Sequence, residues 1–111
     1  MKRAILSTII SFGLTTGATQ AGTTVSSVEQ ILLYESGDLA YVYPTGGVTA
    51  APACGSGAAY YSFKLNRPRA KEYLAGLMVA QAAGHGVTLT GTGDCTDQAN
   101  SETLAYYSMT K

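Results

Sequence analysis

The chain has no tryptophan, one histidine and two cysteines, and only 13% of its 111 residues are charged. A hydrolytic triad needs a base held between a nucleophile and an acid. His85 instead stands between two glycines at the end of an expected helix, where a capping or solvated role is typical. A zinc site needs more Cys and His ligands than this chain offers, and there is no CxxC motif. We therefore expect no metal, no cofactor and no enzymatic activity.

Motifs for phosphate binding and glycoside hydrolysis are also missing. The segment GTGD at residues 91–94 lacks the lysine and the following helix of a phosphate-binding loop. A glycosidase needs two carboxylates flanking its substrate. Three of the five acids that would have to supply them lie in turns, where Asp is commonly structural. These five are Glu35, Asp38, Asp94, Asp97 and Glu102.

No run of the sequence is long enough for a membrane span, which needs about 20 apolar residues. The apolar stretch at residues 4–14 is shorter and contains polar residues. It follows Lys2 and Arg3 and precedes the small, polar residues 15–21, which is the order of a secretion signal. We expect residues 1–21 to be a signal peptide cut after Ala21, with Ala18 as the alternative. The rest, 22–111, is then a single secreted or periplasmic domain.

Removing 21 of the 111 residues leaves 90, a size at which a domain is often marginally stable. Two of the seven basic residues leave with the signal, so five basic and seven acidic residues remain and the net charge is −2. A nucleic-acid-binding domain usually carries a basic stripe, and we expect no nucleic acid as a partner. The basic cluster around the expected helix start is interpreted as solvating it, and consists of Lys64, Arg67, Arg69 and Lys71.

The two cysteines predict a staple for this small domain. In an oxidising compartment an even pair indicates a disulfide, here between Cys54 and Cys95. Such a bridge also restrains the long, Gly-rich loop over residues 44–59.

Local patterns predict the order β-β-β-α-β-β, with residues 22–27 as a frayed end. Apolar and polar residues alternate in LAYVYP and YYSFKL, and the turn at 35–38 makes the first two strands a hairpin. Asn66 is a favoured N-cap, Pro68 fits a first helical turn, and Gly84 suits a helix end. The expected strands cover residues 28–34, 39–44, 60–65, 87–92 and 101–109, and the helix covers 66–83.

This is the chain order of an OB-fold, a small Greek-key barrel with a helix between its third and fourth strands. The fold class is α+β and mostly β. A mixed α+β sandwich with the same order is the alternative.

The helix is apolar on every side over residues 74–80, LAGLMVA. One sheet covers only one stripe of a helix, so such a helix favours burial on a second side as well. An exposed apolar patch often marks an interface, although alanine also tolerates exposure. We expect the helix to mediate self-association through Leu74, Ala75, Gly76, Met78, Val79 and Ala80.

The layout resembles the binding subunits of bacterial toxins that assemble as pentamers of OB-folds, in the branch paired with subtilase-type or pertussis-like catalytic subunits. The resemblance spans nearly all of residues 22–111. It is carried by YESGDLAYVYPTGG (34–47), Cys54, YYSFKL (60–65), PRAKEYLAGLMVAQAAG (68–84) and Cys95. It implies helices around a central pore, a barrel surface that binds sialylated or other cell-surface glycans, and a catalytic toxin subunit as a further partner. No motif aligns the family's sugar-contacting residues with this chain.

Eight tyrosines offer surfaces for such a ligand. In the adjacent pairs at 60–61 and 106–107, one ring of each should point outward, and about half of the tyrosines should lie in the core. Outward aromatic rings can stack on sugars or join protein interfaces. The expected glycan site comprises Ser36, Asp38, Tyr41, Tyr43, Tyr60, Asp94 and Tyr106. The alternative function is a periplasmic or surface domain whose apolar helix binds a different protein.

Overall fold

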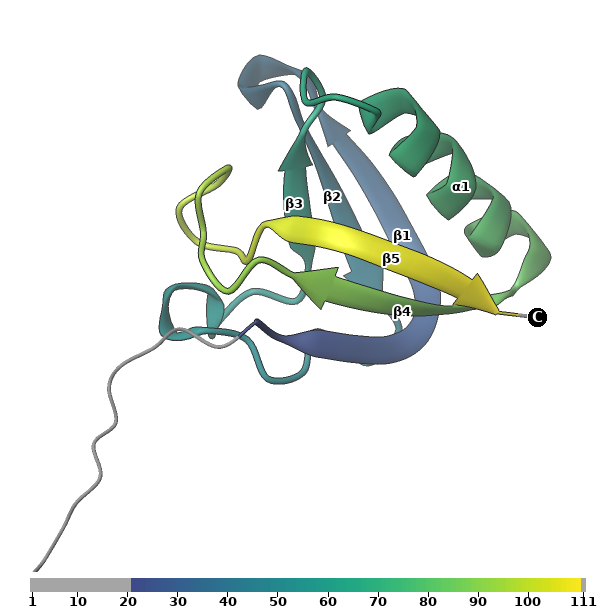
Figure 1. Ribbon diagram of the computed structural model, residues 1–111, viewed down its shortest axis with the longest axis horizontal. Coiled ribbons are helices and arrows are strands. Elements are labelled where there is room, and N and C mark those ends of the chain that lie inside the picture. Colours follow the sequence, from purple (N-terminus) through teal and green to yellow (C-terminus); the bar gives the residue numbers. More distant parts are fainter. Residues whose placement is uncertain (1–20, 111) are drawn as a thin grey trace, which may run out of the picture.

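The computed structural model describes residues 21–110, so the expected signal peptide lies outside the described residues except for Ala21. The described part is one five-stranded antiparallel sheet with one helix and two short 3-10 turns (Figure 1). The predicted order of elements is confirmed. In chain order the elements are β1 (Thr23–Tyr34), η1 (Glu35–Gly37), β2 (Leu39–Pro44), η2 (Ala53–Gly55), β3 (Tyr61–Lys64), α1 (Ala70–Ala83), β4 (Gly86–Gly91) and β5 (Leu104–Thr110).

Strand β1 is shared by the two halves of the sheet, whose strand order is β3-β2-β1-β4-β5. Its first half, residues 23–27, pairs with β4, and its second half, residues 28–34, pairs with β2. An irregularity between Val28 and Gln30 directly follows the change of partner, and β1 curves strongly along its length (Figure 1).

The prediction that residues 22–27 fray is wrong. These polar residues are held by the ladder to β4. Thr24 is buried, and its hydroxyl lies 2.9 Å from the hydroxyl of Tyr61. This segment is therefore a strand although it lacks the alternation of apolar residues that usually predicts one. Its backbone pairs with β4, and the buried hydroxyl of Thr24 has a hydrogen-bond partner.

The edge strands β3 and β5 approach each other at a single parallel bridge between Ser62 and Thr103. The amide of Ser62 donates to the carbonyl of Glu102 at 3.1 Å, and the hydroxyls of Ser62 and Ser101 lie 2.7 Å apart. No continuous ladder joins the two edges in the described residues. The fold is thus mostly β with one helix, and its sheet is open.

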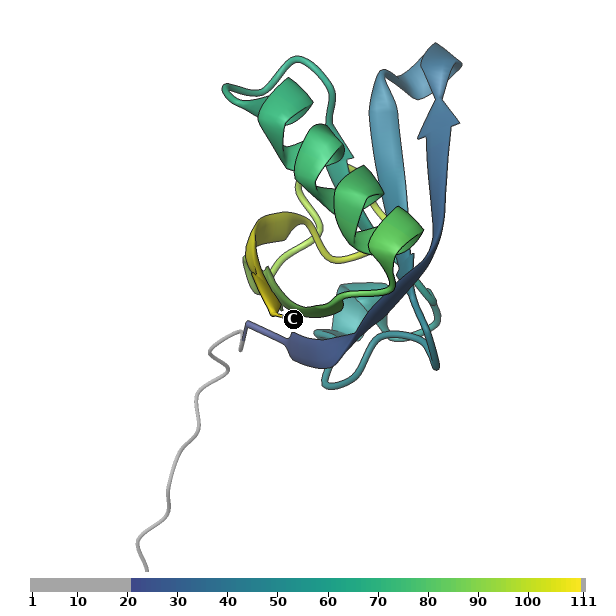
Figure 2. The same cartoon turned by 90° about the vertical axis from the view of Figure 1, so that its right-hand side faces the viewer.

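The core lies between the curved sheet and α1, which runs across the concave side (Figure 2). Leu77 and Ala80 of α1 are fully buried. The helix ends where predicted, because Gly84 adopts φ 71°, a left-handed conformation that glycine takes without strain. The remaining buried hydrophobic residues of this core are Val28, Ala40, Val42, Tyr61, Phe63, Ala70, Val87, Leu89 and Leu104.

The predicted start of the helix at Asn66 is wrong, since α1 begins at Ala70. The residues before it form turns that direct Arg67 toward β5. Its guanidinium donates to the carbonyls of Leu104 and Ala105 at 2.6 and 3.0 Å and lies 4.7 Å from the ring centre of Tyr73. Arg67 therefore binds the edge of β5 and does not merely solvate the helix start.

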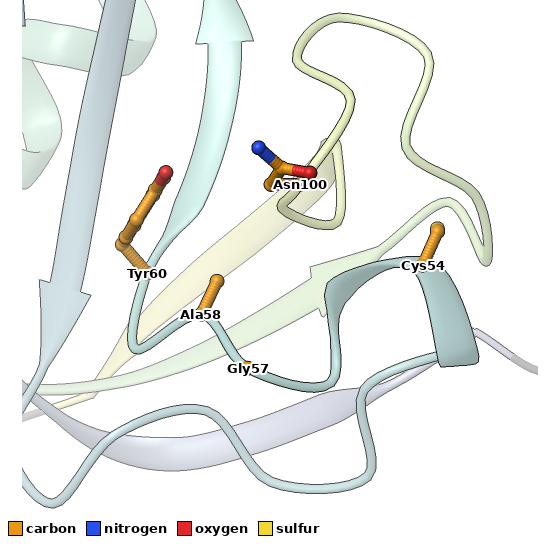
Figure 3. Close-up of a pocket in the computed structure, with 5 residues that line it drawn as sticks. All are labelled: Cys54, Gly57, Ala58, Tyr60 and Asn100. Atoms are coloured by element: carbon orange, nitrogen blue, oxygen red, sulfur yellow. The ribbon is translucent and has the colours of Figure 1, made fainter.

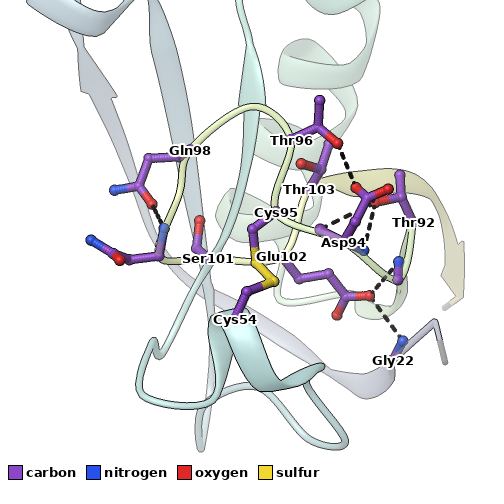
Figure 4. Close-up of a disulfide and its surroundings, with 12 residues drawn as sticks. Gly22, Cys54, Thr92, Asp94, Cys95, Thr96, Gln98, Ser101, Glu102 and Thr103 are labelled. Carbon is purple, nitrogen blue, oxygen red and sulfur yellow. Dashed lines mark hydrogen bonds between the residues drawn. A yellow bond between two sulfur atoms is a disulfide. The ribbon is translucent and has the colours of Figure 1, made fainter. Parts of the chain in front are cut away.

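The predicted disulfide between Cys54 and Cys95 is confirmed. It joins η2 to the connection between β4 and β5, two segments 41 residues apart in the sequence (Figure 4). This pairing fits an oxidising compartment. Among residues 21–110, no helix has the length and apolar character needed to cross a membrane.

Replacing both cysteines with alanine should lower the free energy of unfolding by about 3 kcal/mol, because closing a loop of this length restricts the unfolded chain. Urea denaturation of the oxidised wild type and of the C54A/C95A variant measures the difference. The reduced wild type is the matched control and should unfold like the variant. Equal stability of the oxidised protein and the variant would contradict the prediction.

Candidate functional site

Four tyrosines form a connected cluster on the outer face of β2 and its neighbours. The rings of Tyr41 and Tyr60 are stacked with centroids 4.4 Å apart. Tyr43 lies 5.1 Å from Tyr60, and Tyr34 lies 5.9 Å from Tyr41. We call Tyr34, Tyr41, Tyr43 and Tyr60 the tyrosine cluster.

The strand period explains why these rings meet. Ala40 and Val42 point into the core and are fully buried, so Tyr41 and Tyr43 take the opposite face. Val42 is paired with Tyr61, and Tyr60 directly precedes β3. The prediction that one tyrosine of the 60–61 pair points outward is confirmed, because Tyr61 is buried and Tyr60 is half-buried.

An amide from the β4–β5 connection orders the tyrosine hydroxyls. The Nε2 of Gln98 donates to the hydroxyls of Tyr41 at 3.3 Å and Tyr60 at 3.1 Å. The Oε1 of Gln98 accepts a hydrogen bond from the backbone amide of Asn100 at 2.7 Å. This bond defines which way the Gln98 side-chain amide is oriented. Burial raises the pKa of Tyr60, and the neighbouring Tyr41 raises it further.

A shallow pocket of about 360 Å³ opens beside the cluster. Figure 3 shows Tyr60, Ala58 and Gly57 along the segment that leads into β3, with Asn100 extending from the β4–β5 connection. Cys54 completes the lining. The pocket thus combines one aromatic ring, one side-chain amide and a wall rich in backbone groups, so its lining is polar as well as apolar.

Of the predicted glycan-site residues, the structure brings together Tyr41, Tyr43 and Tyr60. Ser36 and Asp38 lie in the turn between β1 and β2, at the end of the hairpin that carries Tyr34 and Tyr41. Asp38 has a positive φ of 56°, and its carbonyl accepts from the amide of Leu65 at 2.8 Å. Its backbone therefore has a structural role in the turn.

Asp94 and Tyr106 lie apart from the tyrosine cluster. Asp94 lines a second pocket together with Arg67, and its carboxylate accepts from the hydroxyls of Thr92 and Thr96, both at 2.7 Å. The Thr96 bond, followed by that from Thr92, lowers the pKa of Asp94. Tyr106 is 58% exposed on β5, and its ring makes none of the aromatic contacts found among the described residues.

Sequence reasoning missed Tyr34, Gln98 and Asn100 as site residues. Tyr34 directly precedes the predicted turn. Pairing of the two hairpin strands across that turn would have predicted that Tyr34 lies near Tyr41. Gln98 and Asn100 lie in an irregular connection with no periodicity, and their position depends on the tertiary fold.

The expected helix interface divides into two faces. Ala75, Met78 and Val79 are exposed, whereas Ala80 is fully buried in the core and cannot contact a second chain. Leu74 and Gly76 are half-buried. A Cβ on Gly76 would overlap the hydroxyl of Tyr107, so the small size of Gly76 serves packing within the chain.

Among residues 21–110, no three His, Cys, Asp or Glu side chains group as metal ligands. His85 follows the helix end, where its amide donates to the carbonyl of Ala80 at 3.0 Å. No protein-family model matches this chain, and searches of curated proteins and of solved structures also find no match.

Replacing Tyr41 with phenylalanine should lower the pKa of Tyr60 toward its ordinary value, because a neighbouring phenol is removed. A folded-state pKa above the unfolded value means that Tyr60 contributes stability below about pH 10, and this contribution disappears as pH rises through the folded pKa. An NMR titration of the tyrosine ring carbons measures the shift. Tyr106→Phe is the control and should leave Tyr60 unchanged; an unchanged pKa in Tyr41→Phe would contradict the assignment.

Proposed function

We propose that this chain is a secreted, non-catalytic module that binds cell-surface glycans through the tyrosine cluster, Gln98 and Asn100. The observation that carries the proposal is the stacked pair Tyr41–Tyr60, whose hydroxyls share one oriented amide and whose edge borders a pocket. Aromatic faces provide apolar contact area for the C–H face of a sugar ring. Amide and phenol groups at the rim of the same surface supply hydrogen bonds to sugar hydroxyls.

The arrangement of strands supports an OB-fold as the architecture of this module. Strand β1 is shared between two sheet halves, α1 connects β3 to β4, and the parallel bridge Ser62–Thr103 lies where a barrel would close. The disulfide supports export to the periplasm or beyond the cell. These features agree with the resemblance to toxin binding subunits, which adds a catalytic subunit as a partner.

We extend the proposal to a homo-oligomer, a pentamer as the resemblance implies. The outer face of α1 exposes Met78 and Val79 to 53% and 54%. From Tyr73 to Ala83 the helix has no charged residue, so two copies of this face would not repel each other. The alternative is that this face of α1 binds a different protein, as expected for a protein-interaction domain.

Alanine at Tyr41 or Tyr60 should weaken glycan binding by about tenfold or more, because truncating a central aromatic contact removes most of its binding energy. A glycan array, followed by titration of the best ligand, measures the loss. Tyr106→Ala is the matched control, since it removes an exposed tyrosine outside the cluster. A wild-type protein that binds neither glycans nor cells would contradict the function, and retained binding in both variants would contradict the site.

Light scattering after size exclusion should give the native mass of an oligomer for the mature, oxidised protein. Val79→Glu should shift that mass toward a monomer, because a charge in an apolar interface is left without a partner. Val25→Glu is the control, because Val25 is 78% exposed and strand alternation places it on the face of β1 opposite buried Thr24. A monomeric wild type would contradict self-association and direct attention to a foreign partner.

A further inference from the structure

Glu102 is a carboxylic acid buried in the fold with only 1% of its surface exposed. Its Oε2 accepts hydrogen bonds from the backbone nitrogens of Gly22 and Gly93, both at 2.9 Å (Figure 4). Its Oε1 is also buried and has no hydrogen-bond partner among residues 21–110. In the same residues, the one ion pair within 4.0 Å is Arg69–Glu72, whose side chains are exposed at the start of α1. Within this part of the chain, Glu102 therefore has no side-chain cation within 4.0 Å of its carboxylate.

A buried carboxylate with one unpaired oxygen is costly, because the charge has lost its hydration without full compensation. Two neutral amides on Oε2 reduce this cost but supply no opposite charge. The surroundings are nevertheless shaped for the group, since a Cβ on Gly91 would overlap the carboxylate. Such a site favours a small cation that can reach both oxygens.

Gly22 is one of the two residues whose backbone nitrogen reaches this carboxylate. Its carbonyl accepts from the amide of Gly91 at 2.9 Å, so its backbone is held at the end of the β1–β4 ladder. A Cβ at this position would lie 2.5 Å from the carbonyl oxygen of Ala50 and 2.8 Å from Oε1 of Glu102. Only glycine fits without movement of the neighbours, and the unpartnered Oε1 lies directly beside this residue.

Gly22 is also the first residue after the expected signal-peptide cut. We propose that removal of the signal turns the nitrogen of Gly22 into an α-ammonium group that forms a buried ion pair with Glu102. Hydrolysis of the Ala21–Gly22 bond by a signal peptidase consumes one water, leaves a carboxylate on Ala21 and frees the amine of Gly22, which takes up a proton. The group then carries three N–H donors in place of one, enough to keep the bond to Oε2 and to serve Oε1 as well.

The ion pair makes the folded domain sensitive to where the chain was cut. A cut after Ala18 would leave residues 19–21 attached, and the nitrogen of Gly22 would stay a neutral amide. Ala21 is exposed whereas Gly22 is buried, so the correct cut must precede docking of this end. The ion pair affects maturation and stability, and it does not depend on the ligand bound by the tyrosine cluster.

A thermodynamic cycle tests the pair with four proteins: the chain starting at Gly22 and the chain starting at Thr19, each with Glu102 and with Glu102→Gln. In the chain that starts at Gly22, E102Q should increase the unfolding equilibrium constant at pH 7 by about tenfold or more, because it leaves a buried charge unpaired. In the chain that starts at Thr19, E102Q should have a much smaller effect or stabilise. Equal effects of E102Q in both chains would overturn the proposal.

Chemical modification gives a second readout that does not require E102Q to fold. In the native chain starting at Gly22, the α-amine should react with an acetylating reagent at least about tenfold more slowly than in urea, because it is buried in an ion pair. A short exposed peptide beginning Gly-Thr-Thr, added to the same reaction, is the control for intrinsic reactivity. An α-amine that reacts in the folded protein as fast as in the peptide would overturn the pair. So would an N-terminal sequence of the exported protein that begins at Thr19.

Discussion

The double pairing of β1 is the constraint on which the rest of the structure depends. Its first half belongs to the ladder with β4 and its second half to the ladder with β2, so one strand joins both halves of the sheet. The partner changes between Ser27 and Val28, and the irregularity that follows between Val28 and Gln30 bends the strand around the core. The same register sets Tyr43 opposite Gln30 and Tyr41 opposite Leu32. The outer face that carries the tyrosine cluster is therefore a consequence of how β1 is shared.

The connection between β4 and β5 links that face to the beginning of the chain. One part of it presents Gln98 and Asn100 to the tyrosine cluster, and Glu102 follows as the group that holds Gly22. The connection is also anchored at Asp97, whose carboxylate accepts from the amide of Lys64 at 3.0 Å, and at Cys95 by the disulfide. A connection with no regular secondary structure is thus restrained along most of its length.

The alternation of residues along the strands and the disulfide bond could be predicted from the sequence. The period of two in LAYVYP is a local property, and it places Tyr41 and Tyr43 on one shared face of the strand. The cysteine pair needed only the compartment argument. The glycine at the helix end also acts locally, through its own backbone conformation.

Other features depend on contacts between distant segments, and no local pattern reveals them. Residues 22–27 contain a single large apolar side chain, Val25, which is exposed, while the buried side chain is that of Thr24, whose hydroxyl lies 2.9 Å from the hydroxyl of Tyr61. In α1, apolar residues surround the whole helix, so the pattern cannot separate buried Ala80 from exposed Met78. The predicted helix start at Asn66 was wrong because the residues before Ala70 form turns. In these turns the guanidinium of Arg67 donates hydrogen bonds to carbonyls at the edge of β5.

The tyrosine cluster combines order with accessibility, and this combination favours a binding role over a purely structural one. Tyr61 shows the structural use of the residue, with its ring in the core and its hydroxyl bonded to Thr24. Tyr41 and Tyr60 remain half-buried, yet their rings are stacked and their hydroxyls are held by Gln98. Such rings lose little further conformational freedom when a ligand binds, so more of the contact energy appears as affinity. Cys54 lines the adjacent pocket, so the disulfide that stabilises the fold also holds the wall against which a ligand would rest.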